Sequence, residues 1–142
     1  MELTDQEQGE RRRMVAEFMP QTPFLAALGV VVERYEPDDV TVRLPFRADL
    51  TNDGEHYHGG VIATVIDTTG AACAWSAHDF TKGTRASTVS MSIQYVRACT
   101  RSDLICTART VRRARELIFT DIAAAGEDGM VVAHAVQTYR IT

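Results

Sequence analysis

Several features that mark specialised classes of protein are scarce in this 142-residue chain. Its three cysteines, Cys73, Cys99 and Cys106, are widely spaced without a Cys-x-x-Cys pair, which argues against a disulfide framework. Nine glycines and four prolines without a repeating period exclude a collagen-like chain. The longest apolar run, residues 24–32, is far shorter than the roughly 20 residues that span a bilayer.

Positive charge is also scarce. The chain has 15 Lys and Arg against 19 Asp and Glu, a net charge of −4, whereas nucleic-acid-binding domains are usually basic. The polar N-terminus, residues 1–5, lacks the pattern of a secretory signal. With 45% hydrophobic and 24% charged residues, the composition is typical of one globular domain, for which we expect a cytoplasmic location.

The chain begins with signals for two helices. Thr4 and Glu7 form the pattern of a capping box, which predicts a helix that ends before Pro20. Thr22-Pro23 then predicts the start of a short helix that stops at Gly29. We therefore divide the chain into a helical arm, residues 1–22, and a domain, residues 23–142.

The domain has the pattern of strands around one apolar helix. Residues 61–75 are apolar on nearly every side of a helical wheel, which indicates a buried helix. Alternating or β-branched segments predict strands over Val30–Glu36, Val40–Leu44, Ser87–Arg97, Leu104–Val111, Leu117–Ala125 and Met130–Ile141. In the third of these, Val89, Met91, Ile93 and Tyr95 alternate onto one face. The order predicts an α+β domain whose antiparallel sheet curls around the helix.

One charged residue, Asp67, lies inside the predicted buried helix. A carboxylate in an apolar setting is costly unless it is paired, and such a group suits general-base chemistry. A solvated stripe of the helix or a polar contact between subunits would also explain it.

The sequence His58-Gly59-Gly60 precedes this helix. Glycines let another molecule approach the backbone closely, and the first N–H groups of a helix are unpaired at its positive end. This is the geometry of an oxyanion hole. Asp67 lies about 10 Å beyond Gly60 along the helix axis, so we expect a dimer to bring Asp67 of one subunit to Gly59 of the other.

Together, Asn52, His58-Gly59-Gly60 and Asp67 resemble the active-site segment of hotdog-fold acyl-CoA thioesterases of the PaaI-like, phenylacetic-acid-degradation branch. In that branch His-Gly-Gly begins six residues after the Asn, and an acidic residue follows nine residues after the His; both spacings hold here. Residues 88–97 and 112–120 are also similar to the family. One departure is Glu55, which stands where the family usually has Gly, directly after Gly54.

The resemblance implies a hotdog fold and the hydrolysis of an acyl-CoA to free acid and CoA. It implies that the Gly59 N–H polarises the thioester carbonyl with help from Gly60. It gives Asp67 the role of general base or nucleophile, and gives Asn52 and His58 that of orienting the water or the thioester.

Three further residues are matched by the resemblance. Thr88 would assist the water or the carboxylate, and Arg97 and Arg112 would bind the CoA phosphates through guanidinium–phosphate pairs. A solvated surface position is the alternative for each arginine. We expect a homodimer or homotetramer with an acyl-CoA substrate, no metal or organic cofactor, and no nucleic-acid or membrane partner.

Other interpretations remain open from the residues alone. His56 and His58, with Asp53 nearby, have a spacing that suits zinc, and Cys73 with His78 are candidates for a nucleophile and base. A hotdog hydratase or dehydratase and a non-catalytic acyl-CoA-binding domain share the resemblance to the fold.

Overall fold

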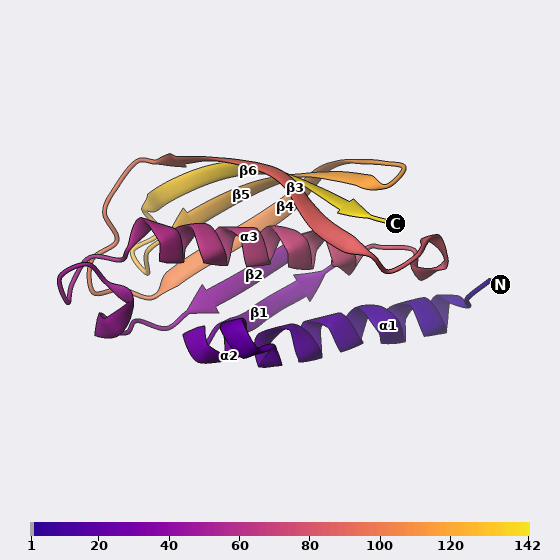
Figure 1. Ribbon diagram of the computed structural model, residues 1–142, viewed down its shortest axis with the longest axis horizontal. Coiled ribbons are helices and arrows are strands. Elements are labelled where there is room, and N and C mark those ends of the chain that lie inside the picture. The colour runs from indigo at the N-terminus through magenta and orange to yellow at the C-terminus, as the bar shows by residue number, and fades with distance from the viewer. Residues whose placement is uncertain (1) are drawn as a thin grey trace.

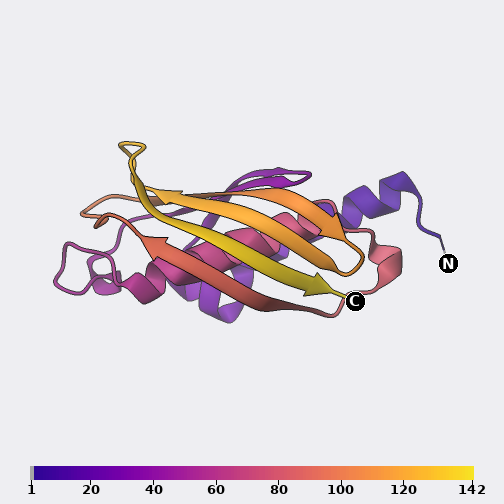
Figure 2. The same ribbon diagram turned by 90° about the horizontal axis from the view of Figure 1, so that it is seen from above.

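The computed structural model describes residues 2–142. Six antiparallel strands form one sheet in the order β1-β2-β4-β5-β6-β3, and this sheet curves around the long helix α3 (Figures 1 and 2). The α+β order predicted from the sequence is confirmed. Its elements are β1 (Val31–Glu36), β2 (Asp39–Leu44), α3 (Gly59–Ser76), β3 (Ala86–Tyr95), β4 (Leu104–Ala114), β5 (Leu117–Ala125) and β6 (Val131–Ile141).

The arm contains α1 (Asp5–Phe18) and one 3-10 turn, and α2 (Pro23–Leu28) follows as the first helix of the domain. The capping box is present, because the Thr4 hydroxyl accepts from the Glu7 N–H and the Glu7 carboxylate accepts from the Thr4 N–H. Gly29 ends α2 in the left-handed conformation, with φ of 80°. Figure 1 shows both helices beside β1 and α3, at the open side of the curved sheet.

Helix α3 packs its apolar side against the concave face of the sheet. The core between them is formed by side chains from α3 and four of the strands, including Ile62, Val65, Ile66, Val40, Val42, Leu44, Leu104, Cys106, Ile122 and Val132. The helix is not buried on every side as its composition suggested. A stripe that includes Ala63, Asp67 and Ala71 is only half-buried, so one face of the helix stays open.

A β-bulge interrupts β3. The pairing of β3 with β6 changes register between Thr88 and Ser90. The expected alternation therefore fails at Val89, which is 55% exposed, while Met91 packs against the core. The bulge also turns Thr88 toward α3, so Thr88 and Met91 face the same helix although they are three residues apart. A regular strand would place residues with an odd spacing on opposite faces.

Strand β3 is one edge of the sheet, paired only with β6. Eight of its ten residues are exposed. A long, exposed edge presents unpaired backbone groups to a further strand. No helix within residues 2–142 has the length and apolarity needed to cross a bilayer.

Candidate active site

The Asp67 carboxylate is held by two side chains from the sheet. The Thr88 hydroxyl and the Gln137 amide each donate to Asp67 Oδ1 at 2.7 Å. Gln137 Nε2 also donates to the Asp67 carbonyl oxygen at 3.1 Å. Burial, and less strongly the nearby Asp67 charge, raises the pKa of the Tyr139 phenol on β6, which stays neutral. The half-buried carboxylate is therefore bound through one oxygen by neutral donors.

Gln137 was not among the residues selected from the sequence. It lies on β6 and has no exposed surface, and Gly70 makes room for it on α3. A Cβ atom at Gly70 would lie 2.3 Å from Gln137 Oε1. Two signals in the sequence could have identified it. Gln137 is a polar residue at a position of the strand that alternates with the buried residues Ala135 and Tyr139. In the helix, Gly70 follows Asp67 by three residues and so lies on the same side.

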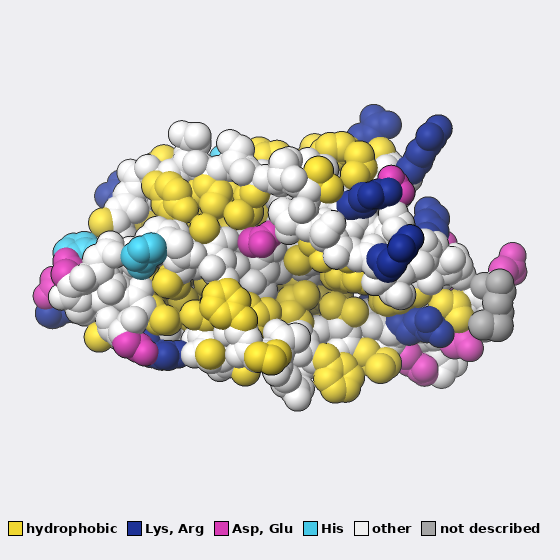
Figure 3. All heavy atoms as spheres, viewed as in Figure 1, with side chains coloured by type: hydrophobic (Ala, Val, Ile, Leu, Met, Phe, Trp, Pro, Cys, Tyr) yellow, Lys and Arg dark blue, Asp and Glu magenta, His cyan; other side chains and the backbone are white. Residues whose placement is uncertain are grey.

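Asp67 lines an open groove of about 450 Å³ on the exposed face of α3. Two further elements contribute to the groove: α2 with its N-cap through Thr22, Phe24 and Leu25, and β3 through Met91, together with Ala63, Thr64 and Thr68 of α3. Hydrophobic side chains gather along this face between α3 and the arm (Figure 3). Trp75 and Phe80 do not line this groove, and their rings stack on each other with centroids 5.5 Å apart.

The first turn of α3 carries a second group of candidate residues. His58 is the N-cap, and its Nδ1 accepts from the Gly60 N–H at 2.8 Å. A Cβ atom at Gly60 would lie 2.9 Å from that nitrogen, so the cap requires glycine there. Within residues 2–142, the Gly59 N–H has no hydrogen-bond acceptor. It is therefore the free donor at the positive end of the helix.

Tyr95 at the end of β3 marks the position of this donor, because its hydroxyl donates to the Gly59 carbonyl at 3.1 Å. Gly59 and Asp67 are eight residues apart in one helix, which corresponds to roughly 12 Å along the axis. One protomer therefore does not bring the donor and the carboxylate together. Both lie along β3, with Tyr95 beside Gly59 and Thr88 beside Asp67.

Asn52 lies in the exposed loop before α3. Its N–H donates to the His56 carbonyl at 2.9 Å and closes a tight turn. Gly54 carries the left-handed position of this turn, with φ of 91°. Glu55, which replaces the usual glycine of the family, keeps a negative φ and pairs with Arg101. The turn is therefore made one residue earlier, without strain at Glu55.

The two arginines expected to bind phosphate lie at opposite ends of the protomer. Arg97 follows β3, close to Tyr95 and the start of α3. Arg112 is exposed on β4 near its last residues, and its neighbour Arg113 donates to the Cys73 carbonyl near the end of α3. One chain therefore does not bring Arg97 and Arg112 to a single ligand.

The alternative metal and cysteine sites find little geometric support. His56 Nδ1 lies 2.6 Å from Asp53 Oδ2. Hydrogen bonds from the backbone and from His56 lower the pKa of Asp53 to about 2. In the described residues, 2–142, no group of three His, Cys, Asp or Glu side chains is placed to hold a metal ion. Cys73 is buried, which raises its pKa, and His78 contacts the Gly83 carbonyl instead.

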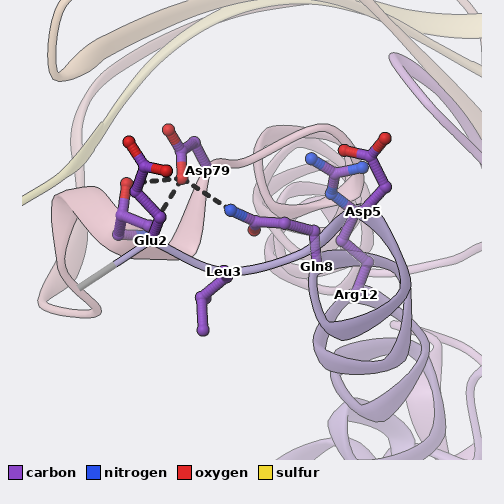
Figure 4. A pocket seen from close by; sticks show the side chains of 7 residues that line it. Glu2, Leu3, Asp5, Gln8, Arg12 and Asp79 are labelled. Carbon is purple, nitrogen blue, oxygen red and sulfur yellow. Dashed lines mark hydrogen bonds between the residues drawn. The ribbon is translucent and has the colours of Figure 1, made fainter.

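A separate cavity of about 550 Å³ lies between the start of α1 and the turn that follows α3 (Figure 4). Asp79 accepts there from Gln8 at 2.7 Å and from Thr81, and Arg12 donates to the His78 carbonyl. These bonds attach the arm to the domain. None of the residues predicted to act on a substrate lines this cavity.

The chain is similar to several known proteins in sequence and in fold. The family "Thioesterase superfamily" matches residues 54–133. A protein of Halobacterium salinarum named "Putative esterase" is 32% identical over 102 residues, which cover 70% of this chain and 67% of that protein. The PaaI protein of E. coli, from the phenylacetic acid degradation operon, has a TM-score of 0.81 at 20% identity and covers 95% of this chain and 96% of its own.

A hypothetical thioesterase from Streptococcus pneumoniae, solved with coenzyme A, has a TM-score of 0.71 at 22% identity. The similarity covers 80% of this chain and 85% of that one. At these identities the solved structures establish the fold alone, and they confirm the PaaI-like hotdog arrangement expected from the sequence.

Proposed function

We propose that this chain, which belongs to the thioesterase superfamily, hydrolyses an acyl-CoA thioester at a site shared between two copies. Membership of the superfamily itself indicates a hydrolase that acts on thioesters. The choice of acyl-CoA and the roles of the individual residues are the proposal. The observation that carries it is the Asp67 carboxylate, bound by Thr88 and Gln137 in an apolar groove.

In the proposed reaction, the Gly59 N–H donates to the thioester carbonyl oxygen and stabilises the charge that develops there. Asp67 takes a proton from water as the water oxygen attacks the carbonyl carbon. The C–S bond then breaks, and CoA leaves as its thiolate. His58 fixes the first turn of α3 through its bond to Gly60, and Asn52 in the preceding loop orients the water or the thioester.

Two copies are needed because the donor and the carboxylate are roughly 12 Å apart in one helix. The exposed edge β3 supports a specific pairing. If two β3 strands pair antiparallel about an axis midway between Thr88 and Tyr95, each Thr88 lies opposite Tyr95 of a second copy. Asp67 of each copy then lies beside Gly59 of the other, so a homodimer contains two complete sites. A homotetramer built from two such dimers keeps both sites.

The groove supports an apolar acyl group. Phe24, Leu25 and Met91 line it beside Asp67, and Phe24 is 62% exposed. The coenzyme A bound to the Streptococcus pneumoniae thioesterase supports a CoA leaving group. In the proposed dimer the α3 helices of the two copies run in opposite directions. The start of α3 in one copy and the end of α3 in the other therefore point to the same side of the site, which lets Arg97 of one copy and Arg112 of the other lie on that side.

The proposal is tested by measuring CoA release from acetyl-, hexanoyl-, palmitoyl-, benzoyl- and phenylacetyl-CoA, with the wild type and Asp67→Asn in parallel. Turnover of one or more of these esters, reduced by at least about 10³-fold in the variant, is the expected result. Equal turnover in the variant would remove Asp67 from the mechanism. Binding of the esters without release would identify a non-catalytic acyl-CoA-binding domain.

A further inference from the structure

We propose that Gln137 is a positioning residue that binds Oδ1 of Asp67 together with Thr88 and so leaves Oδ2 as the oxygen that takes the proton from water. This inference rests on the proposed function, because it assigns a role to the carboxylate. It goes beyond the family resemblance, because the site residues matched through the family do not include Gln137.

Both donors bind the same oxygen of the Asp67 carboxylate. Thr88 Oγ1 and Gln137 Nε2 each lie 2.7 Å from Asp67 Oδ1. Among residues 2–142, no donor contacts Oδ2. A carboxylate oxygen that already accepts two short hydrogen bonds is a weaker base than its free partner. The arrangement therefore distinguishes two otherwise equivalent oxygens.

Gln137 is polar at a fully buried position, and its contacts with Asp67 are the reason for that polarity. Its side chain is fully buried, and its Oε1 has no hydrogen-bond partner among residues 2–142. Burying an unpaired amide oxygen costs free energy that a methionine at this position would not incur. The amide is oriented by two acceptors, the Asp67 carbonyl and Oδ1, which requires Nε2 to face Asp67.

Helix α3 leaves room for the Gln137 side chain at Gly70. A Cβ atom at Gly70 would lie 2.3 Å from Oε1 and 2.8 Å from Nε2 of Gln137. Glycine inside a helix is unfavourable relative to alanine, so its presence here needs a packing reason. Gly70 lies one turn beyond Asp67 on the same side of α3, which is where the amide must pass to reach the carboxylate.

The uncharged surroundings make this hydrogen bond decisive for the carboxylate. The groove residues from α2, α3 and β3 around Asp67 carry no charge. On β6, Tyr139 lies near Asp67 and stays neutral, whereas His134 and Arg140 pair with Asp121 and Glu116. Within these elements hydrogen bonds rather than a cation hold the carboxylate, and the loss of either donor leaves Oδ1 with a single side-chain hydrogen bond.

The test is to measure kcat and KM from pH 5 to 9 for Gln137→Met and Gln137→Glu, using an acyl-CoA that the wild type hydrolyses. Methionine keeps the length of the side chain and removes the donor. We expect kcat to fall about tenfold or more at neutral pH, with KM within about twofold. The acid limb of the kcat profile should move upward by about one pH unit. Gln137→Glu places a second carboxyl group beside Asp67 and should move that limb further.

Controls separate positioning from folding and from the proposed function itself. Gln6→Met makes the same exchange on the exposed side of α1 and should leave kcat, KM and the pH profile unchanged. Thr88→Val removes the other donor and should move the acid limb in the same direction as Gln137→Met. Thermal melts establish that each variant is folded.

Three outcomes would contradict the inference. If Gln137→Met keeps the kcat and pH profile of the wild type while Asp67→Asn is inactive, Gln137 does not position the carboxylate, and the thioesterase proposal stands. If Gln137→Met lowers kcat and melting temperature without moving the pH profile, the residue is only structural. If Asp67→Asn is as active as the wild type, the proposed function itself is wrong.

Discussion

The two groups required for the proposed hydrolysis are built in different ways. The donor half, His58, Gly59 and Gly60, is one turn of backbone closed by a single side-chain cap. The carboxylate half, Asp67, Thr88 and Gln137, joins a helix and two strands, and two of its members are 70 residues apart. A local motif is thus enough to present an N–H group, whereas orienting one carboxylate oxygen requires the assembled fold.

After Asp67→Asn, the largest effect is expected from removing the Gly59 N–H, the one group that the donor half presents to the thioester. Gly59→Pro removes the N–H and little else, because proline is well tolerated at the first position of a helix. The preceding residue, His58, already has the extended conformation that a following proline requires, with ψ of 134°. We expect kcat to fall by about 10²–10³-fold with an unchanged fold. Steady-state kinetics and circular dichroism check this.

The comparison variant is Gly59→Ala, which keeps the N–H. Its Cβ atom would lie 3.7 Å from the Tyr95 ring, an ordinary contact. It should lose far less activity than the proline variant. Equal losses in the two variants would mean that the shape of this turn matters and its donor does not.

The carboxylate half should be sensitive to a substitution at a neighbouring residue that is not one of its three members. Gly70→Ala places a methyl group 2.3 Å from Gln137 Oε1 and displaces the amide from Asp67. We expect kcat to fall about tenfold and the free energy of unfolding to fall by about 1–3 kcal/mol. Kinetics and denaturant unfolding measure both.

Gly9→Ala is the matched control for that exchange. It also replaces a glycine inside a helix, but its Cβ atom would meet only the end of Arg13 at 3.9 Å. It should stabilise the protein by about 0.5–1 kcal/mol and leave kcat unchanged. If Gly70→Ala behaves in the same way, the side chain of Gln137 adapts without cost, and the carboxylate half is less rigid than its contacts indicate.

A smaller effect is expected from the cap of the donor half. His58→Ala removes the acceptor of the Gly60 N–H and should lower the free energy of unfolding by about 1 kcal/mol, with a several-fold loss of kcat. His58→Asn supplies another favoured N-cap side chain and should restore the stability. Chemical denaturation measures the free energy of unfolding of both variants. Equal stability of His58→Ala and the wild type would show that the cap is dispensable.

The smallest effect concerns a region outside both halves. Burial lowers the pKa of His78, so the unfolded chain binds a proton at a higher pH than the folded protein does. Stability should therefore decrease as the pH falls below the ordinary histidine range near 6.5. We expect the melting temperature to drop by a few degrees between pH 7.5 and 5.5. His78→Phe should reduce that drop, and an unchanged drop would assign it to other groups.

The sequence was sufficient for the fold and for the donor half because their signals are local. The alternating strands, the apolar segment of α3 and His58-Gly59-Gly60 each lie within a short stretch of chain. Asp67 was noticed because a charge is rare in an apolar helix. Its surroundings were not predictable in the same way, since they depend on which strands lie beside α3.

The contacts that the sequence did not predict share this dependence on tertiary structure. Gln137 gives no local signal except its position in the buried phase of β6. Thr88 was matched through the family, but its contact with Asp67 depends on a β-bulge that the residues of β3 do not predict. Phe24 and Leu25 join the groove because α2 packs beside α3, which short-range periodicity does not describe.

The bulge in β3 makes the length of this strand more constrained than its composition. A deletion of Ser92, beyond the bulge, would change the number of residues between the two contacts by one, and either the segment from Thr88 to Met91 or the segment from Ile93 to Tyr95 would then turn to the opposite face. The protein would keep every side chain of its proposed site and still lose the contact of Thr88 with Asp67 or of Tyr95 with Gly59. In descendants of this sequence, substitutions along β3 should therefore be common and insertions or deletions rare.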